Sequence, residues 1–362
     1  MEQKVSIESS LGIKVEFQDS VSGVSTRSSS NSQAVETCVS NWRPVLPLPS
    51  SPIATWPIRP FQLLKDLLNG WLPISEKLII AGVSILTWAY LSPALERCRE
   101  FKIDWIAQIY FRNLLLLTLV AGGLHLYLYT FRRQGDRFRY DPREFQKGSR
   151  RFTFNNQIYD NIFWSLASGV TVWTAYEVVG MWAYANGLMP FLSWSDNPVW
   201  FVAMFVLIPL FGGNFHFYWI HRLIHWQPLY RTVHHLHHRN VVMGPWSGLS
   251  MHPVEHLIYL SSTLIHVVLA SHPIHFIFHL QTKVLQAPTS HAGFEKVTAG
   301  EESDKGLRVG DFFHQLHHRY FECNYGGPEI PFDQWFGTFH DGTPEATKRI
   351  RERMRRTGVS RT

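Results

Sequence analysis

The sequence has few charged residues for its length. Charged side chains make up 17% of the 362 residues, whereas hydrophobic residues make up 45%. A soluble globular domain typically carries about 25% charged residues. This shortage of charge makes a membrane protein the first class to test.

Cysteine is also scarce. The three cysteines, Cys38, Cys98 and Cys323, are odd in number, lie far apart and form no CxxC pair. Neither a disulfide framework nor a thiolate metal site is therefore predicted. The first residues also lack the apolar run of a signal peptide, so no cleaved signal is expected.

Basic residues gather in two segments, 132–151 and 348–361, within a chain whose net charge is +6. Neither segment has the fold signature of a nucleic-acid binder, so no nucleic-acid partner is predicted. Basic residues that flank membrane segments account for both better.

The apolar residues are concentrated after the N-terminal part of the chain. Residues 1–55 are rich in Ser, Thr, Asn and Pro, and they are predicted to form a disordered arm. Four apolar stretches follow, at 78–93, 106–130, 162–184 and 199–220. Each approaches the length of about 20 residues that crosses the hydrocarbon core of a bilayer. A buried core helix of a soluble protein is the alternative for any one stretch, but four in succession favour about four transmembrane helices.

The orientation follows from the charges of the loops. The basic loop after the second stretch should face the cytoplasm, so residues 56–154 form a first membrane hairpin with a cytoplasmic loop. The end of the fourth stretch and the basic tail 342–362 should then face the same side. The apolar segment 257–287 is broken near Pro273 and is too short for two crossings, which predicts a short re-entrant hairpin. The predicted fold class is an all-α membrane protein with a cytoplasmic helical cap.

Histidine, by contrast, is abundant, with nineteen residues in the chain. Three clusters stand out. HRLIH contains His221 and His225, HHLHH contains His234, His237 and His238, and HQLHH contains His314, His317 and His318. Spacings of three and four residues place side chains on one face of a helix, whereas His235 points elsewhere. Eight imidazoles are too many for one metal at ordinary coordination numbers, and they suit two.

Imidazole is also an appropriate ligand for a redox-active metal. Neutral nitrogen donors suit iron that changes oxidation state, although zinc accepts the same ligands. A histidine-rich metal transporter and a non-catalytic scaffold are the alternatives. Transport ligands are expected at mid-membrane depth, whereas these clusters lie at helix ends or beyond.

The order HxxxH, HxxHH, HxxHH resembles the fatty acid hydroxylase and sterol desaturase superfamily of histidine-box membrane di-iron oxygenases. Further matching motifs are HPVEH at 252–256, HAG at 291–293, NYG at 324–326 and DQWFGT at 333–338. The resemblance covers residues 155–341, which we take as the catalytic domain. It implies that the eight cluster histidines bind two iron ions, with His252, His256 and His291 as further candidate ligands.

The resemblance also implies an O2-dependent hydroxylation or desaturation of a lipid, whether a sterol, a sphingoid or another isoprenoid or acyl lipid. The sequence contains neither a GxGxxG nucleotide fingerprint nor an HPGG haem signature. Electrons are therefore expected from a separate donor, such as cytochrome b5 or a ferredoxin with its reductase. The expected location is the endoplasmic reticulum or a bacterial inner membrane, with the metal site facing the cytoplasm.

Two groups of neighbouring residues have less specific interpretations. Asp311 or Glu255 can accept a hydrogen bond from a ligand imidazole, or either can be merely structural. The aromatic residues between Phe211 and Trp219 can line an apolar substrate tunnel, or pack and anchor the chain near the membrane interface. No catalytic residue beyond the metal ligands is predicted.

Overall fold

The computed structural model describes residues 42–54, 56–57, 59–71 and 75–357. All of these belong to one compact unit, Val39–Thr362, whereas the other unit, Met1–Cys38, lies outside the described residues. The described chain is mostly helical, and its regular β-structure is one two-stranded sheet. The helical part of the predicted fold class is therefore observed.

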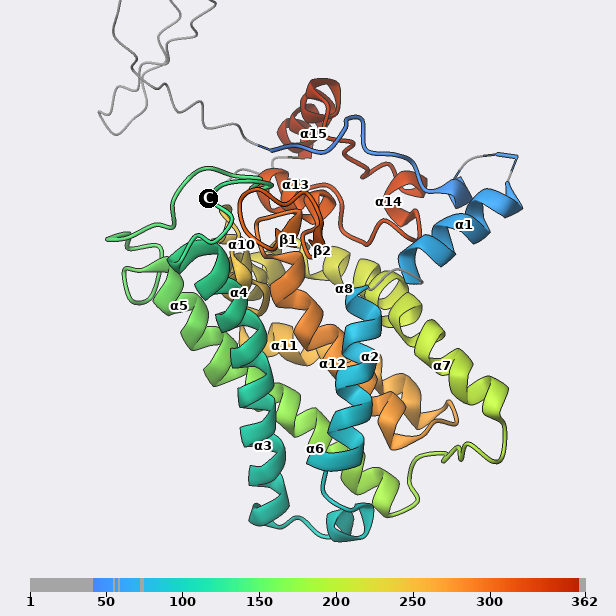
Figure 1. Cartoon of the computed structure of the whole chain (residues 1–362). Coiled ribbons are helices and arrows are strands. Elements are labelled where there is room, and N and C mark those ends of the chain that lie inside the picture. The colour runs from blue at the N-terminus through green and yellow to red at the C-terminus, as the bar shows by residue number, and fades with distance from the viewer. Residues whose placement is uncertain (1–41, 55, 58, 72–74, 358–362) are drawn as a thin grey trace, which may run out of the picture. The chain divides into compact units, whose positions relative to one another are not determined.

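Long helices form the body of the molecule (Figure 1). A short helix, α1 (Pro60–Trp71), precedes α2 (Glu76–Leu86), which continues to Leu91 through a π-helical turn. Similar π-helical turns join successive segments into three longer helices: α3 (Ile103–Leu117) with α4 (Gly123–His125), α5 (Gln157–Phe163) with α6 (Thr171–Ala185), and α7 (Pro198–Leu210) with α8 (Phe217–Ile224).

Two of these helices, Ile103–Thr130 and Pro198–Ile224, are long and apolar enough to cross a membrane. They contain the predicted stretches 106–130 and 199–220. The stretches 78–93 and 162–184 are largely helical too, but within the described residues they do not meet the same test. Large apolar side chains are exposed on the two candidate spans, among them Phe111, Leu115, Leu119, Val199 and Val202. Such an exposed apolar surface is what a lipid-facing helix presents.

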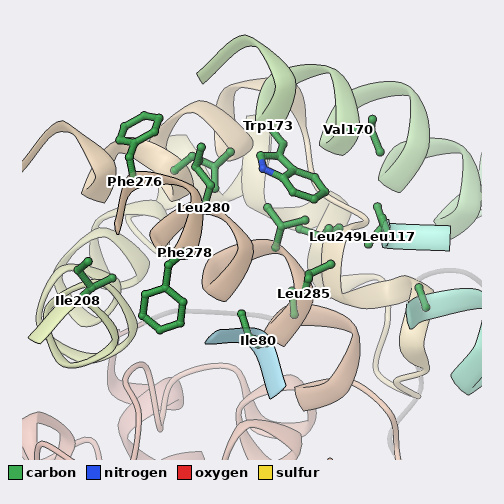
Figure 2. Close-up of a cluster of buried hydrophobic side chains, with 14 of the residues drawn as sticks. Ile80, Leu117, Val170, Trp173, Ile208, Leu249, Phe276, Phe278, Leu280 and Leu285 are labelled. Carbon is green, nitrogen blue, oxygen red and sulfur yellow. The ribbon is translucent and has the colours of Figure 1, made fainter. Parts of the chain in front are cut away.

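Helix α12 (Pro273–Ser290) lies at the centre of the molecule. Every residue in it except Gln286 and Ser290 is buried, so it is enclosed on all sides. Figure 2 shows its side chains Phe276, Phe278, Leu280 and Leu285 packed among residues that include Ile80, Trp173, Ile208 and Leu249. Helix α11 (Pro253–Leu260), extended by a 3-10 segment to Val267, precedes α12, so the chain turns at 268–272, beside the predicted break.

Polar side chains also join the long helices to one another. A guanidinium nitrogen of Arg112 in α3 donates to Glu177 in α6 at 2.5 Å, and Asn113 donates to the same carboxylate at 3.2 Å. Both members of the ion pair are buried. On the other side of the core, Gln281 of α12 bonds with the hydroxyls of Ser84 and Thr87. These contacts satisfy polar groups that would be costly to bury alone.

The remaining elements include the short helices that carry most of the clustered histidines. The remaining α-helices and strands are α9 (Gln227–Leu229), α10 (His235–His238), the antiparallel strands β1 (Lys296–Thr298) and β2 (Gly306–Arg308), α13 (Phe312–Tyr320), α14 (Phe332–Trp335) and α15 (Pro344–Thr357). Helices α10 and α13 and the two strands gather at the upper end of the molecule in Figure 1. The sheet pairs Val297 with Leu307 at its centre.

A segment before α1 packs against this end of the molecule. The backbone N–H of Trp42 donates to the carbonyl of Arg139, and that of Leu48 donates to the carbonyl of Asp341. This segment falls within the arm predicted over residues 1–55, of which residues 1–41 lie outside the described chain. The part from Trp42 onward therefore makes contacts that its composition does not predict.

Candidate metal centre

Nine buried histidines converge in two groups. The first group is His221, His225, His234, His238 and His317, and the second is His237, His291, His314 and His318. Within each group, one ring nitrogen from every residue lies within 4.8 Å of those from the others. Each group therefore has the compactness that a single metal ion requires.

The two HxxHH clusters divide their histidines between the groups. In the segment that ends in α10, His234 and His238 are four residues apart and join the first group, while His237 joins the second. In α13 the division is reversed, because His314 and His318 join the second group and His317 joins the first. Residues four apart share a helix face, so each cluster lies between the two groups and serves both.

Main-chain carbonyls fix the orientation of several imidazoles. Nδ1 of His221 lies 2.7 Å from the carbonyl oxygen of Tyr325, and Nδ1 of His317 lies 2.6 Å from that of Cys323. Nδ1 of His291 and that of His318 lie 3.0 and 3.1 Å from the carbonyl oxygens of Ala287 and Asn240 respectively. A carbonyl only accepts, so Nδ1 must carry the proton in each of these rings. Nε2 of each neutral ring is then left with a free lone pair.

The Nε2 atoms of neighbouring rings face one another at short distances. The Nε2 atoms of His291 and His318 are 3.1 Å apart, and both rings carry their proton on Nδ1. In the first group, Nε2 of His238 lies 3.1 Å from Nε2 of His225 and 3.0 Å from Nε2 of His317. Facing lone pairs repel unless a cation lies between them. Ligand nitrogens about 2.1 Å from a metal and at right angles would be about 3 Å apart, so the donor set fits a metal ion in each group.

The surrounding protein also keeps these imidazoles neutral. Burial lowers the pKa of His238, His317 and His318 well below the ordinary value, and it lowers the pKa of His237 to about 4. Neutral imidazole is the form that binds metals, so little proton competition is expected at neutral pH.

One buried carboxylate supports the first group from outside. Nδ1 of His234 lies 2.7 Å from Oε1 of Glu255, and both side chains are buried. Burial raises the pKa of Glu255 well above its ordinary value. Asp311, the other carboxylate that the sequence suggested, instead accepts the backbone N–H of His314 at the start of α13. Glu255 therefore has the ring contact expected of a carboxylate behind a metal ligand.

The structure brings together all eight histidines of the three clusters. His291, a further candidate, joins the second group. The other two candidates lie outside both groups. His252 accepts the backbone N–H of Val254 at the start of α11, and Nδ1 of His256 lies 2.9 Å from the hydroxyl of Ser168. His235 is exposed, as its place in the spacing predicts.

Two residues beside the centre carry no sequence motif. The ring centroid of Phe217 lies 4.8 Å from that of His221 and 6.3 Å from that of His314, so Phe217 borders both groups. The Nζ atom of Lys283 lies 5.0 Å from the Phe217 ring. The one signal for Lys283 in the sequence is that it is a charged residue within the apolar segment 257–287, and no predicted site residue includes it.

Residues 201–338, which contain both groups, match the family model described as fatty acid hydroxylase. Similar proteins include a Delta(7)-sterol-C5(6)-desaturase of Nicotiana tabacum, 26% identical over 48% of this chain and 62% of the relative. A Delta(7)-sterol 5(6)-desaturase of Gibberella zeae is 30% identical over 42% of this chain and 45% of the relative. A methylsterol monooxygenase of Aspergillus fumigatus is 30% identical over 42% of this chain and 52% of the relative. The chain thus spans about half the length of these curated relatives, and no solved structure matches it.

Proposed function

We propose that this chain is a member of the fatty acid hydroxylase family, whose model matches residues 201–338, and that it is a membrane di-iron oxygenase that hydroxylates or desaturates a lipid. The observation that carries the proposal is the pair of adjacent, fully buried imidazole groups. Imidazole donors suit iron, and a pair of bound iron ions would supply reductive activation of O2. We assign one ion to each group of histidines.

The chain's own residues prepare the site for these ions. The carbonyls of Cys323, Tyr325 and Asn240 hold three imidazoles with their Nε2 lone pairs turned into the groups. Burial keeps bulk water away from the centre and strengthens every electrostatic contact within it. The ring of Phe217 gives the centre an apolar border beside both groups, which suits an approaching C–H bond.

The proposed substrate is a lipid taken from the bilayer, and the relatives favour a sterol. Two of them are named as Delta(7)-sterol desaturases and one as a methylsterol monooxygenase. The choice between hydroxylation and desaturation depends on how a substrate is held beside the centre. We propose that electrons come from a separate chain, such as cytochrome b5 or a ferredoxin with its reductase. We also propose that the centre faces the cytoplasm, in the endoplasmic reticulum or a bacterial inner membrane.

The test is a pair of histidine substitutions from one cluster. His237→Ala removes a member of the second group, whereas His235→Ala changes an exposed neighbour outside both groups. We expect His237→Ala to lose about half of the bound iron and essentially all product, because the site requires two ions. Metal analysis of the purified protein and lipid mass spectrometry of an expressing host measure the two effects.

The product should gain one oxygen or lose two hydrogens, and only when O2 and a donor are present. His235→Ala should retain both metal and product. Iron-loaded protein that changes no lipid in the presence of a donor would contradict the proposal. Metal flux into proteoliposomes without O2 or reductant would favour a transporter instead, and undisturbed biological function after loss of the metal would favour a scaffold.

A further inference from the structure

Lys283 is a buried lysine whose role the metal centre does not explain. It lies in the middle of α12, and only 4% of its surface is exposed. Its Nζ donates to the carbonyl of Gly212 at 3.2 Å and lies 3.8 Å from the centre of the Tyr259 ring. Within the described part of the chain, no carboxylate pairs with it. An ammonium group has three N–H donors, so one carbonyl and one ring face leave donor capacity unused.

The position of Lys283 connects it to both halves of the metal centre. Its Nζ lies 5.0 Å from the ring of Phe217, the residue that borders His221 of the first group and His314 of the second. Phe217 therefore lies beside Lys283 and beside both groups of histidines. A group bound at Nζ would be held a short distance from the reacting centre, which is how a positioning residue works.

The immediate surroundings contain further polar atoms without partners. Nε2 of His279, one turn before Lys283 in α12, and Nδ1 of His216 are buried and have no hydrogen-bond partner in the described chain. Gly212 lies between these groups, because its carbonyl accepts from Lys283 and a Cβ added to it would lie 2.5 Å from Nε2 of His279. Gly212 belongs to the π-helical turn Phe211–His216, and such turns are frequent at functional sites. Buried polar groups of this kind usually have a partner.

We propose that Lys283 anchors the substrate by donating a hydrogen bond to an oxygen atom at the polar end of the lipid. The apolar part of the lipid then extends past Phe217 to the metal pair. This inference rests on the proposed function and deepens it, since it makes Lys283 the residue that sets which carbon reaches the centre. The shared chemistry is an acceptor oxygen, which a sterol hydroxyl or an acyl carboxylate can supply.

The binding experiment compares matched probes that differ only in this oxygen. Purified protein in lipid nanodiscs is equilibrated with a radiolabelled Delta(7)-sterol or its 3-deoxy analogue, and separately with palmitic acid or hexadecane. We expect the wild type to prefer the oxygenated member of one pair by about tenfold to a hundredfold, the contribution of a buried hydrogen bond from a charged donor. The pair that shows the preference identifies the class of lipid.

Three variants test whether Lys283 causes that preference. Lys283→Met keeps the chain length and removes the donors, so the preference should vanish, whereas Lys283→Arg should keep part of it. Lys305→Met changes an exposed lysine and should behave as the wild type. Iron content and thermal unfolding are measured alongside, since Lys283→Met should leave both unchanged. A preference that survives in Lys283→Met, or no preference in the wild type for either pair, would overturn the inference.

A labelling experiment on the wild type avoids any dependence on folding of the variant. Palmitaldehyde condenses with a lysine amine to give an imine and water, and borohydride supplies the hydride that reduces the imine to a stable secondary amine. Peptide mass spectrometry should find Lys283 labelled, and an excess of the preferred probe should protect it but not Lys305. Absence of labelling or of protection at Lys283 would count against the inference. Neither experiment needs O2 or turnover, so their outcome is separate from that of the product assay.

Discussion

At the scale of single residues, the state of the metal centre depends on atoms that are not ligands themselves. Carbonyl oxygens hold the proton of several rings on Nδ1, and these carbonyls come from three separate segments of the chain, at Asn240, at Ala287 and at Cys323 and Tyr325. His234 differs, because its Nδ1 faces the carboxyl group of Glu255. A carboxylate makes a ligand imidazole more basic than a carbonyl does, so the first group has one distinctive member.

We therefore expect Glu255→Gln to weaken metal binding at the first group by about 10–100-fold, the usual effect of replacing such a partner. The substitution keeps the size of the side chain and replaces its ionisable carboxyl group by a neutral amide. Competitive titration with a metallochromic chelator measures the affinity of each site. Glu345→Gln in α15 changes an exposed carboxylate and is the matched control. Equal affinity in wild type and Glu255→Gln would show that Glu255 has only a packing role.

At the scale of elements, the centre depends on how tightly α12 is enclosed. The 3-10 segment Pro245–Leu249 crosses α12 at Gly248, where an added Cβ would overlap the carbonyl group of Ala287 and crowd the nitrogen of Pro288. His291, a member of the second group, follows the end of the same helix. Packing at this crossing therefore sets the position of a candidate ligand.

Gly248→Ala should destabilise the protein by about 1–3 kcal/mol, because a backbone overlap cannot be relieved by a rotamer change. Iron content of the second group should fall with it. Gly82→Ala in α2 is the control, since nothing lies within 4 Å of its added Cβ. That variant should gain about 0.5–1 kcal/mol. Thermal unfolding in detergent compares the two, and equal midpoints would contradict the proposed crossing.

The ion pair between α3 and α6 gives a second prediction at this scale. Arg112→Leu leaves the Glu177 carboxylate buried without its partner, which should cost about 3–5 kcal/mol. Replacing both residues by Leu should restore most of the loss, because no buried charge then remains. Denaturant titration of the two single variants and the double variant measures the difference. Additive losses in the double variant would mean that the two residues act independently.

At the scale of the whole molecule, the exposed apolar helices meet the buried polar centre near the C-terminal end of the second candidate span, where His221 lies. The candidate spans Ile103–Thr130 and Pro198–Ile224 carry the apolar outer surface, and α10 and α13 carry histidines of both groups at the upper end in Figure 1. Histidines at and beyond the end of a candidate span are compatible with a centre at one face of a membrane. The proposed cytoplasmic orientation derives from the basic loop 132–151.

The orientation predicts the outcome of glycosylation mapping in a eukaryotic host. An Asn-X-Thr acceptor placed at 193–196, between α6 and α7, should be glycosylated, because this connection lies on the lumenal side in the proposed topology. The same acceptor placed at 300–305, between β1 and β2, should stay unmodified. A shift in electrophoretic mobility that an endoglycosidase reverses measures the modification. Glycosylation at 300–305 would reverse the proposed orientation.

The sequence by itself determined the local features of the protein. The spacings of three and four residues bring pairs of imidazoles onto one helix face, and this requires no contact with the rest of the chain. The long apolar runs likewise predict helices, because their periodicity and length are local properties. The abundance of imidazoles indicated two metals before any distance was known.

Tertiary structure decided how these local features combine. His237 and His317 each join the group that the other ligands of their own cluster do not join. This division depends on how α13 packs against α10, some eighty residues earlier in the chain. The same packing includes His291 and excludes His252 and His256, although all three occur in family motifs. Lys283 lies beside the centre because α12 packs among the other helices at that place. Distances between segments far apart in sequence follow from packing, which no local spacing encodes.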